Sequence, residues 1–154
     1  GTGEITTALY RLGYDITGVD ISNKMIDIAK EKMPKALFLQ DEFSKVVLRL
    51  KTTYDYVIFN YAIHHLTYDE QIKLLKTMSE YLNKYGMIII GDVSKKTQIE
   101  MKSLQKKYEA IWDDEENYPI LDNYLKSELS NQYDIEYKQF NEVAGLYQFI
   151  KKSI

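Results

Sequence analysis

The sequence contains no cysteine and only two prolines among its 154 residues. The absence of cysteine excludes a disulfide scaffold, a thiolate metal site and a cysteine nucleophile. No apolar run approaches the roughly 20 residues that a membrane-spanning helix needs, so we expect no membrane partner. No signal-peptide pattern opens the sequence, and a cytoplasmic location is therefore expected.

An excess of basic residues is also lacking. Lysine and arginine number 20 against 23 acidic residues, which gives a formal net charge of −3. This balance argues against a partner that is a nucleic acid, because nucleic-acid-binding domains usually carry a strong positive charge. The length fits one ordinary domain, and we find no internal repeat or linker, so residues 1–154 are predicted to form a single domain.

Segments typical of strands alternate with segments typical of helices along the chain. This order predicts an α/β fold, a Rossmann-like doubly wound sheet that is mostly parallel. The expected strands are residues 15–20, 36–40, 54–59 and 87–92, followed by an antiparallel hairpin, 134–140 and 146–150, whose turn contains Asn141 and Gly145. The expected helices are residues 5–12, 22–33, 67–82, 95–112 and 119–129, and 41–50 is expected to be a loop with a possible helical turn.

Several residues predict how these helices begin and which side they bury. Thr67 and Glu70 have the spacing of a capping box, and Pro119 is expected to open its helix. In the helix over 22–33, Met25, Ile28 and Ala29 are predicted to point inward.

Three positions are expected to carry chemistry together: Gly1-Thr2-Gly3, Asp20 and Asp41. Each lies where a strand gives way to a helix or loop, and ligands of open α/β sheets bind at that edge. Glycines let the backbone approach a ligand closely, and an acid ending the next strand can accept hydrogen bonds from both hydroxyls of a ribose. Asp20 follows Gly3 by 17 residues, near the expected spacing of about 20. The alternative for Asp20 is a capping role at the helix beginning near Ser22.

These segments, in this order, resemble the class I S-adenosylmethionine-dependent methyltransferase family. The resemblance is carried by Gly1-Thr2-Gly3, by residues 18–22, 40–43, 54–60 and 62–66, by 82–92 and by the terminal hairpin. Within that family, residues 118–122 and the His-His-Leu sequence at 64–66 are similar to the small YrrT-like bacterial enzymes.

The resemblance implies S-adenosyl-L-methionine as cofactor and a role for each matching position. Asp20 would bind the ribose diol and Asp41 the adenine amino group, within segments that also include Ile21, Glu42 and Phe43. Gly1, Thr2 and Gly3 would pass close to the methionine part, with Asn60 and Ile63 flanking it. Met25 would pack on the adenosine, although a core position is an equal alternative for a methionine.

The methyl acceptor is expected to be a small molecule, because the charge balance and the missing cysteine disfavour polymeric nucleic acid. His64 and His65 are the only histidines, and one could act as general base. The alternative is that they cap or pack at the start of the helix at Thr67. Tyr61 and Asp92 also end strands and could face the acceptor. The sequence indicates no metal-binding constellation.

One departure from the family pattern is serious, and two other functions stay open. The family places a strand, and the first glycine of its motif, before the position of Gly1, so the natural protein is expected to be longer. A nicotinamide-dependent dehydrogenase is one alternative, although Thr6 stands where its fingerprint requires glycine or alanine. A non-catalytic cofactor-binding or interaction module is the other.

Overall fold

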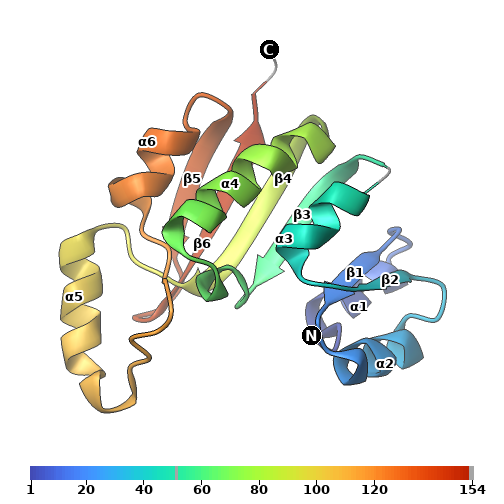
Figure 1. Ribbon diagram of the computed structural model, residues 1–154, viewed down its shortest axis with the longest axis horizontal. Coiled ribbons are helices and arrows are strands. Elements are labelled where there is room, and N and C mark those ends of the chain that lie inside the picture. Colours follow the sequence, from blue (N-terminus) through green and yellow to red (C-terminus); the bar gives the residue numbers. More distant parts are fainter. Residues whose placement is uncertain (51, 153–154) are drawn as a thin grey trace. The chain divides into compact units, whose positions relative to one another are not determined.

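The computed structural model describes residues 1–50 and 52–152, except for the side chains of Phe43, Ser44, Leu48 and Asn123. The chain forms two compact units, Gly1–Leu50 and Lys51–Ile154. We call them the amino-terminal and the carboxyl-terminal unit, and each is described by itself (Figure 1). Among the described residues, no helix is long and apolar enough to cross a membrane.

The amino-terminal unit is built around two parallel strands. Its elements are α1 (Glu4–Arg11), β1 (Thr17–Asp20), α2 (Asn23–Lys32), β2 (Leu37–Gln40), α3 (Phe43–Val46) and a 3-10 turn, Val47–Arg49. The strands pair in register from Thr17 opposite Leu37 to Asp20 opposite Gln40. Because the strands are parallel, both carboxyl ends lie at one edge, where the Asp41 amide donates to the Asp20 carbonyl oxygen at 3.2 Å.

Helix α2 begins where the sequence predicts, but the set of side chains that it buries differs from the prediction. The Ser22 hydroxyl caps the helix by accepting from the Met25 amide at 3.4 Å. The prediction that Met25 points inward is wrong, because 38% of its surface is exposed. Ala29 is buried as predicted, together with Ile26 and Met33, and Ile28 is half-buried. Their spacing places the three buried residues on one face of the helix, and Met25 lies beside that face.

Gly3 holds a backbone conformation that other residues adopt at a cost. Its φ of 75° is left-handed, and a Cβ at this position would lie 2.6 Å from the Met33 side chain. We expect Gly3→Ala to lower the free energy of unfolding by about 1–2 kcal/mol. Denaturant unfolding monitored by circular dichroism measures this, with Gly1→Ala as control, since a Cβ at Gly1 meets no atom within 4 Å. Equal effects of the two substitutions would contradict this explanation.

The carboxyl-terminal unit contains a four-stranded sheet. Its strands are β3 (Tyr54–Asn60), β4 (Leu82–Val93), β5 (Tyr133–Gln139) and β6 (Ala144–Lys151), in the order β3-β4-β6-β5. β3 and β4 are parallel, whereas β6 runs antiparallel to both β4 and β5. The predicted terminal hairpin is therefore confirmed, although Gly145, expected in its turn, lies within β6. Together with the parallel β1–β2 pair, this topology confirms the α/β fold class.

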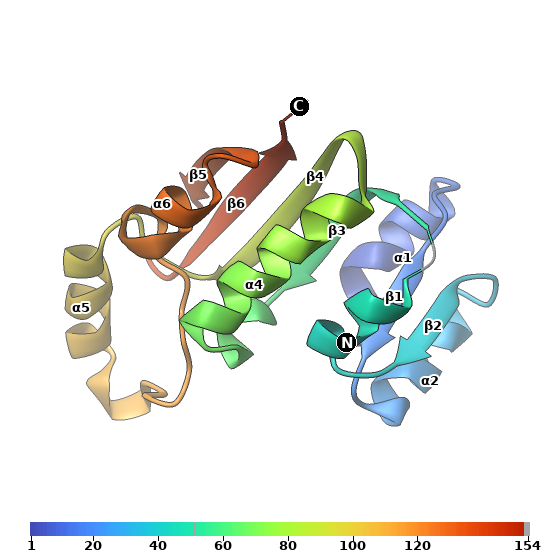
Figure 2. The same cartoon turned by 45° about the horizontal axis from the view of Figure 1, so that its top comes forward.

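Helices α4 (Tyr68–Met78) and α6 (Lys126–Leu129) lie on the same face of this sheet (Figures 1 and 2). The capping box predicted at α4 is confirmed: the Thr67 hydroxyl accepts from the Glu70 amide, and the Glu70 carboxylate accepts from the Thr67 amide. α4 buries Leu74, Leu75 and Met78 towards the core. The buried Tyr133 hydroxyl donates to the Leu75 carbonyl oxygen at 2.6 Å, which ties the helix to β5.

The helix predicted over 95–112 is shorter in the structure. A capping box between Thr97 and Glu100 begins α5 (Gln98–Lys107), and a 3-10 turn, Glu109–Ile111, follows. Ile111, in this turn, is 81% exposed. The helix cannot include Lys95, because that residue forms a parallel bridge with Ile120.

Three other predicted boundaries are also wrong. Pro119 does not begin a helix, since Ile120 is extended and a π-helical turn, Leu121–Leu125, leads into α6. The helix predicted over 67–82 ends at Met78, and after a 3-10 turn, Ser79–Tyr81, residues 82–86 already belong to β4, where the pairing with β3 shifts register. Residues 41–50 contain α3 and a 3-10 turn, which is more helix than expected.

Candidate functional site

Asp20 and the glycine turn come together at the carboxyl end of β1, as the sequence predicts. One carboxylate oxygen, Oδ1, accepts from the Ser22 amide at 2.8 Å. The other, Oδ2, contacts the Gly1 amino group. Ser22 itself supplies the side-chain cap of α2, so Asp20 does not cap the helix end directly. The Asp20 carboxylate therefore lies beside the backbone of the glycine turn.

The environment of Asp20 favours its charged form. Partial burial by itself opposes ionisation of the carboxyl group. The hydrogen bonds from the Gly1 nitrogen and from the Ser22 amide favour the ionised carboxylate. A carboxylate in this state accepts hydrogen bonds strongly, as binding of a ribose diol requires.

Asp41 lies one residue beyond β2 and forms an ion pair. Its Oδ2 accepts from Arg49 at 2.7 Å, and its Oδ1 accepts from the Glu42 amide at 2.9 Å. The hydrogen bond from Arg49, together with that from the Glu42 amide, lowers the pKa of Asp41 despite some desolvation. Arg49 was not predicted as a site residue, and no motif signal at its position could have indicated it. Arg49 occupies one acceptor oxygen of Asp41. The amino group of a ligand that binds this oxygen would have to share it with Arg49 or displace Arg49.

The remaining predicted cofactor residues of the amino-terminal unit are mostly accessible. Ile21 is 66% exposed, and Met25 is exposed as well. Glu42 pairs with Lys45 at 2.9 Å. The side chain of Phe43 lies outside the described residues. Exposed apolar side chains at Ile21 and Met25 provide a surface on which an adenosine could pack.

In the carboxyl-terminal unit, the chain leaves β3 through a strained backbone. Tyr61 has a φ of 47°, an uncommon value for a residue with a side chain. Its amide donates to the Gly91 carbonyl oxygen at 2.8 Å, and its side chain is 52% exposed. Asn60 is exposed at the end of β3, whereas the side chain of Ile63 is fully buried. Ile63 therefore packs in the core, and only its backbone could meet a ligand.

His64 is paired with a buried carboxylate. Its Nδ1 lies 2.6 Å from Oδ1 of Asp92, which is fully buried at the end of β4. The same oxygen accepts from the Val93 amide, while Oδ2 has no hydrogen-bond partner among the described residues. Burial opposes protonation of His64, but the hydrogen bond and charge of Asp92, with smaller contributions from Glu116 and Asp113, raise its pKa above the ordinary value.

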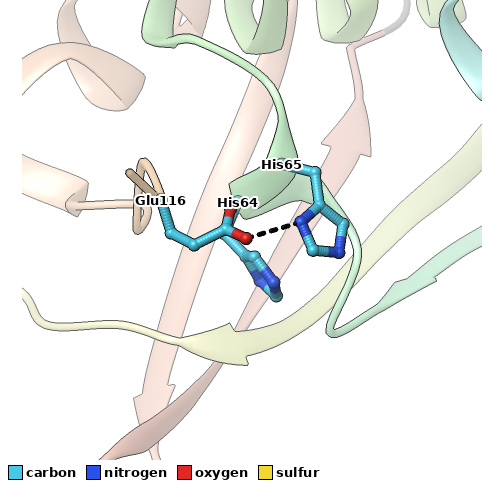
Figure 3. Close-up of side chains that lie close together, drawn as sticks. All are labelled: His64, His65 and Glu116. Atoms are coloured by element: carbon cyan, nitrogen blue, oxygen red, sulfur yellow. Dashed lines mark hydrogen bonds and ion pairs between the residues drawn. The ribbon is translucent and has the colours of Figure 1, made fainter. Parts of the chain in front are cut away.

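His65 and Glu116 complete a second pair next to the first. Nδ1 of His65 lies 2.9 Å from Oε1 of Glu116, and the two imidazole ring centroids are 4.2 Å apart (Figure 3). One ligand atom from each of His64, His65 and Glu116 lies within 4.8 Å of the other two. The sequence places the two histidines side by side, but it gives no signal for Glu116. That residue lies in an acidic run about 50 residues further on, and such runs are usually solvated surface.

The segment carrying Glu116 is fixed by hydrogen bonds on both sides of Asn117. The Asn117 amide donates to the His64 carbonyl oxygen at 2.9 Å, and the Asn117 carbonyl accepts from Gln71 Nε2 at 2.7 Å. Gln71 is fully buried within α4, and it also donates to the Leu66 carbonyl and accepts from Tyr124. A polar side chain in a helix gives no sequence signal of such a role.

Comparison with solved structures shows which fold the chain has. The magnesium protoporphyrin IX methyltransferase of Synechocystis, solved with bound S-adenosylhomocysteine, superposes with a TM-score of 0.73 at 17% identity, over 99% of this chain and 71% of that one. The fold is therefore that of Rossmann-like methyltransferases.

The sequence comparisons define the family. Residues 1–86 match the family model described as a methyltransferase domain. An uncharacterized methyltransferase of Oceanobacillus iheyensis is 30% identical over 95% of this chain and 71% of its own length. Another from Alkaliphilus oremlandii is 27% identical, and the chain covers 62% of it. The chain belongs to the methyltransferase domain family.

Proposed function

We propose that this protein transfers the methyl group of S-adenosylmethionine to a small-molecule acceptor, with residues 1–154 acting as one methyltransferase domain. The observation that carries the proposal is the position of the Asp20 carboxylate at the carboxyl end of β1, against the Gly1–Gly3 turn. This is the edge where α/β folds bind ligands. The family match and the solved neighbour with bound S-adenosylhomocysteine support the same cofactor.

The residues of the amino-terminal unit suit the adenosine and methionine parts of this cofactor. The ionised Asp20 accepts hydrogen bonds from the two ribose hydroxyls, and Asp41 accepts one from the adenine amino group. Gly3, which has no side chain and a left-handed backbone, lets the turn approach closely. When bound, S-adenosylmethionine supplies a methyl group already activated by the sulfonium, so the protein acts mainly by positioning donor and acceptor.

The acceptor is proposed to be small because the chain offers little to hold a polyanion. The net charge is −3, and the groups around His64 are the carboxylates of Asp92, Asp113 and Glu116. Carboxylates repel phosphate backbones. We assign His64, His65 and Tyr61 to the acceptor side of the reaction, while Asn60 and the backbone at Ile63 are assigned to the cofactor.

Calorimetry on the purified full-length protein tests the cofactor assignment. We expect one equivalent each of S-adenosylmethionine and S-adenosylhomocysteine to bind, and NAD to give no heat. Binding of NAD alone would favour a dehydrogenase, and no heat with either methionine derivative would overturn the proposal.

A transfer assay tests the acceptor class. Labelled S-adenosylmethionine is offered with pools of metabolites, RNA and proteins, and we expect label to enter the metabolite pool. Transfer to RNA or protein alone would show that the acceptor is a polymer.

A further inference from the structure

We propose that His64, His65 and Glu116 bind one divalent transition-metal ion. The two histidines lie in the 3-10 turn Ile63–His65, and Glu116 comes from a segment about 50 residues further along the chain. The fold brings one ligand atom of each residue within 4.8 Å of the others (Figure 3). All three belong to the carboxyl-terminal unit, so the site needs no other part of the chain.

The donor set and its spacing suit such an ion. Two imidazoles and one carboxylate form a common ligand set for zinc and for iron(II). Two ligands bound at about 2.1 Å lie roughly 3.0–3.4 Å apart when they share one ion in tetrahedral or octahedral geometry. His65 Nδ1 and Glu116 Oε1 are 2.9 Å apart, which is close to that separation. The His65 side chain is 58% exposed, so its ring can turn to complete the coordination.

Asp92 orients His64 as carboxylates orient metal-bound histidines in other proteins. A proton on Nδ1 of His64 is donated to Asp92 at 2.6 Å, and this tautomer leaves the lone pair of Nε2 for a metal ion. Asp92 is fully buried and is itself fixed by the Val93 amide. A surface histidine that binds a metal ion adventitiously would not need a buried carboxylate hydrogen-bonded to its other ring nitrogen.

The third ligand is also fixed before any ion binds. Asn117, next to Glu116, donates its amide hydrogen to the His64 carbonyl oxygen, and Gln71 holds the Asn117 carbonyl. Backbone hydrogen bonds therefore connect the segment of Glu116 to the turn that carries the histidines. Glu116 is also half-buried, with 20% of its side chain exposed, whereas its neighbours Asp114 and Glu115 are exposed.

Three protein ligands leave at least one coordination position open, as in catalytic rather than structural metal sites. On the proposed function, an acceptor heteroatom would occupy that position. Coordination lowers the pKa of a bound hydroxyl or thiol, so its proton would leave to water. The acceptor oxygen or sulfur would then bond to the methyl carbon as the bond from that carbon to the sulfonium breaks, which leaves S-adenosylhomocysteine. His64 would then act as a metal ligand, in place of the general-base role expected from the sequence.

Zinc titration of metal-free, tag-free full-length protein tests the proposal. We expect calorimetry with ZnCl₂, in millimolar Mg²⁺, to show one equivalent binding with a Kd of about 1 µM or below. His65→Ala and Glu116→Gln should each weaken binding at least tenfold. Both side chains lie partly or largely at the surface, so these variants should fold, which circular dichroism checks. Glu115→Gln is the matched control and should bind as the parent does.

Two outcomes would overturn the site: no zinc binding tighter than about 100 µM, or binding that His65→Ala and Glu116→Gln leave unchanged. Asp92→Asn provides a further check, with an expected 10–100-fold loss of affinity. Calorimetry with S-adenosylhomocysteine on the same preparation separates the two proposals. Zinc binding without it would leave the metal site standing and contradict the methyltransferase function, and the reverse result would contradict only the metal site.

Discussion

Replacing Asp20 by alanine is expected to weaken the binding of S-adenosylmethionine about 100-fold. The carboxylate would lose two hydrogen bonds from the ribose hydroxyls, and bonds to a charged group contribute about 1.5–3 kcal/mol each. Two such bonds sum to at least about 3 kcal/mol, which corresponds to slightly more than two orders of magnitude in Kd. An aspartate carboxyl group is ionised at neutral pH already at its ordinary pKa, so the full effect should be present there.

Calorimetry with S-adenosylhomocysteine measures this effect on Asp20→Ala and on Asp27→Ala. Asp27 is an exposed carboxylate on α2 in the same unit, so it controls for loss of one negative charge. Asp20→Ala also removes the acceptor of the Ser22 amide, and thermal unfolding should confirm that the variant remains folded at the assay temperature. Equal affinities for the two variants would show that Asp20 has only a structural role.

Replacing Gln71 by leucine is expected to lower the free energy of unfolding by about 3–5 kcal/mol. Gln71 is fully buried, and its side-chain amide makes three hydrogen bonds. Nε2 donates to the carbonyls of Leu66 and Asn117, and Oε1 accepts from the Tyr124 hydroxyl at 2.6 Å. Leucine keeps nearly the same volume but removes the partner of three partly buried polar groups. Each such group costs about 1–3 kcal/mol.

Thermal unfolding should show this loss as a fall in Tm of about 10–20 °C. Gln98→Leu is the control, because Gln98 is exposed at the start of α5 and should change Tm little. Tyr124→Phe removes only one of the three hydrogen bonds and should have a smaller effect. A loss below about 1 kcal/mol for Gln71→Leu would show that water or a rearranged segment satisfies the freed groups.

Local signals in the sequence were sufficient for parts of the fold and of the cofactor site. The capping box at Thr67 and Glu70 involves residues three apart, so its interactions do not depend on distant chain segments. The spacing of the glycine turn and Asp20 likewise predicted that they meet at one edge of the sheet, and the Asp20 carboxylate contacts Gly1 there. In contrast, the predicted helix boundaries at Lys95 and Pro119 are wrong. The bridge between Lys95 and Ile120 is a tertiary interaction, which local sequence patterns do not record.

The sequence by itself determined the class of fold, the family and the acids expected to meet the cofactor, because strand order, glycine turns and strand-ending acids are local patterns. Only the tertiary structure decided the surroundings of His64. Asp92 and Glu116 lie 28 and 51 positions from their histidine partners. Chain segments so far apart meet through packing of the whole core, and neither periodicity nor local spacing records which side chains that packing brings together.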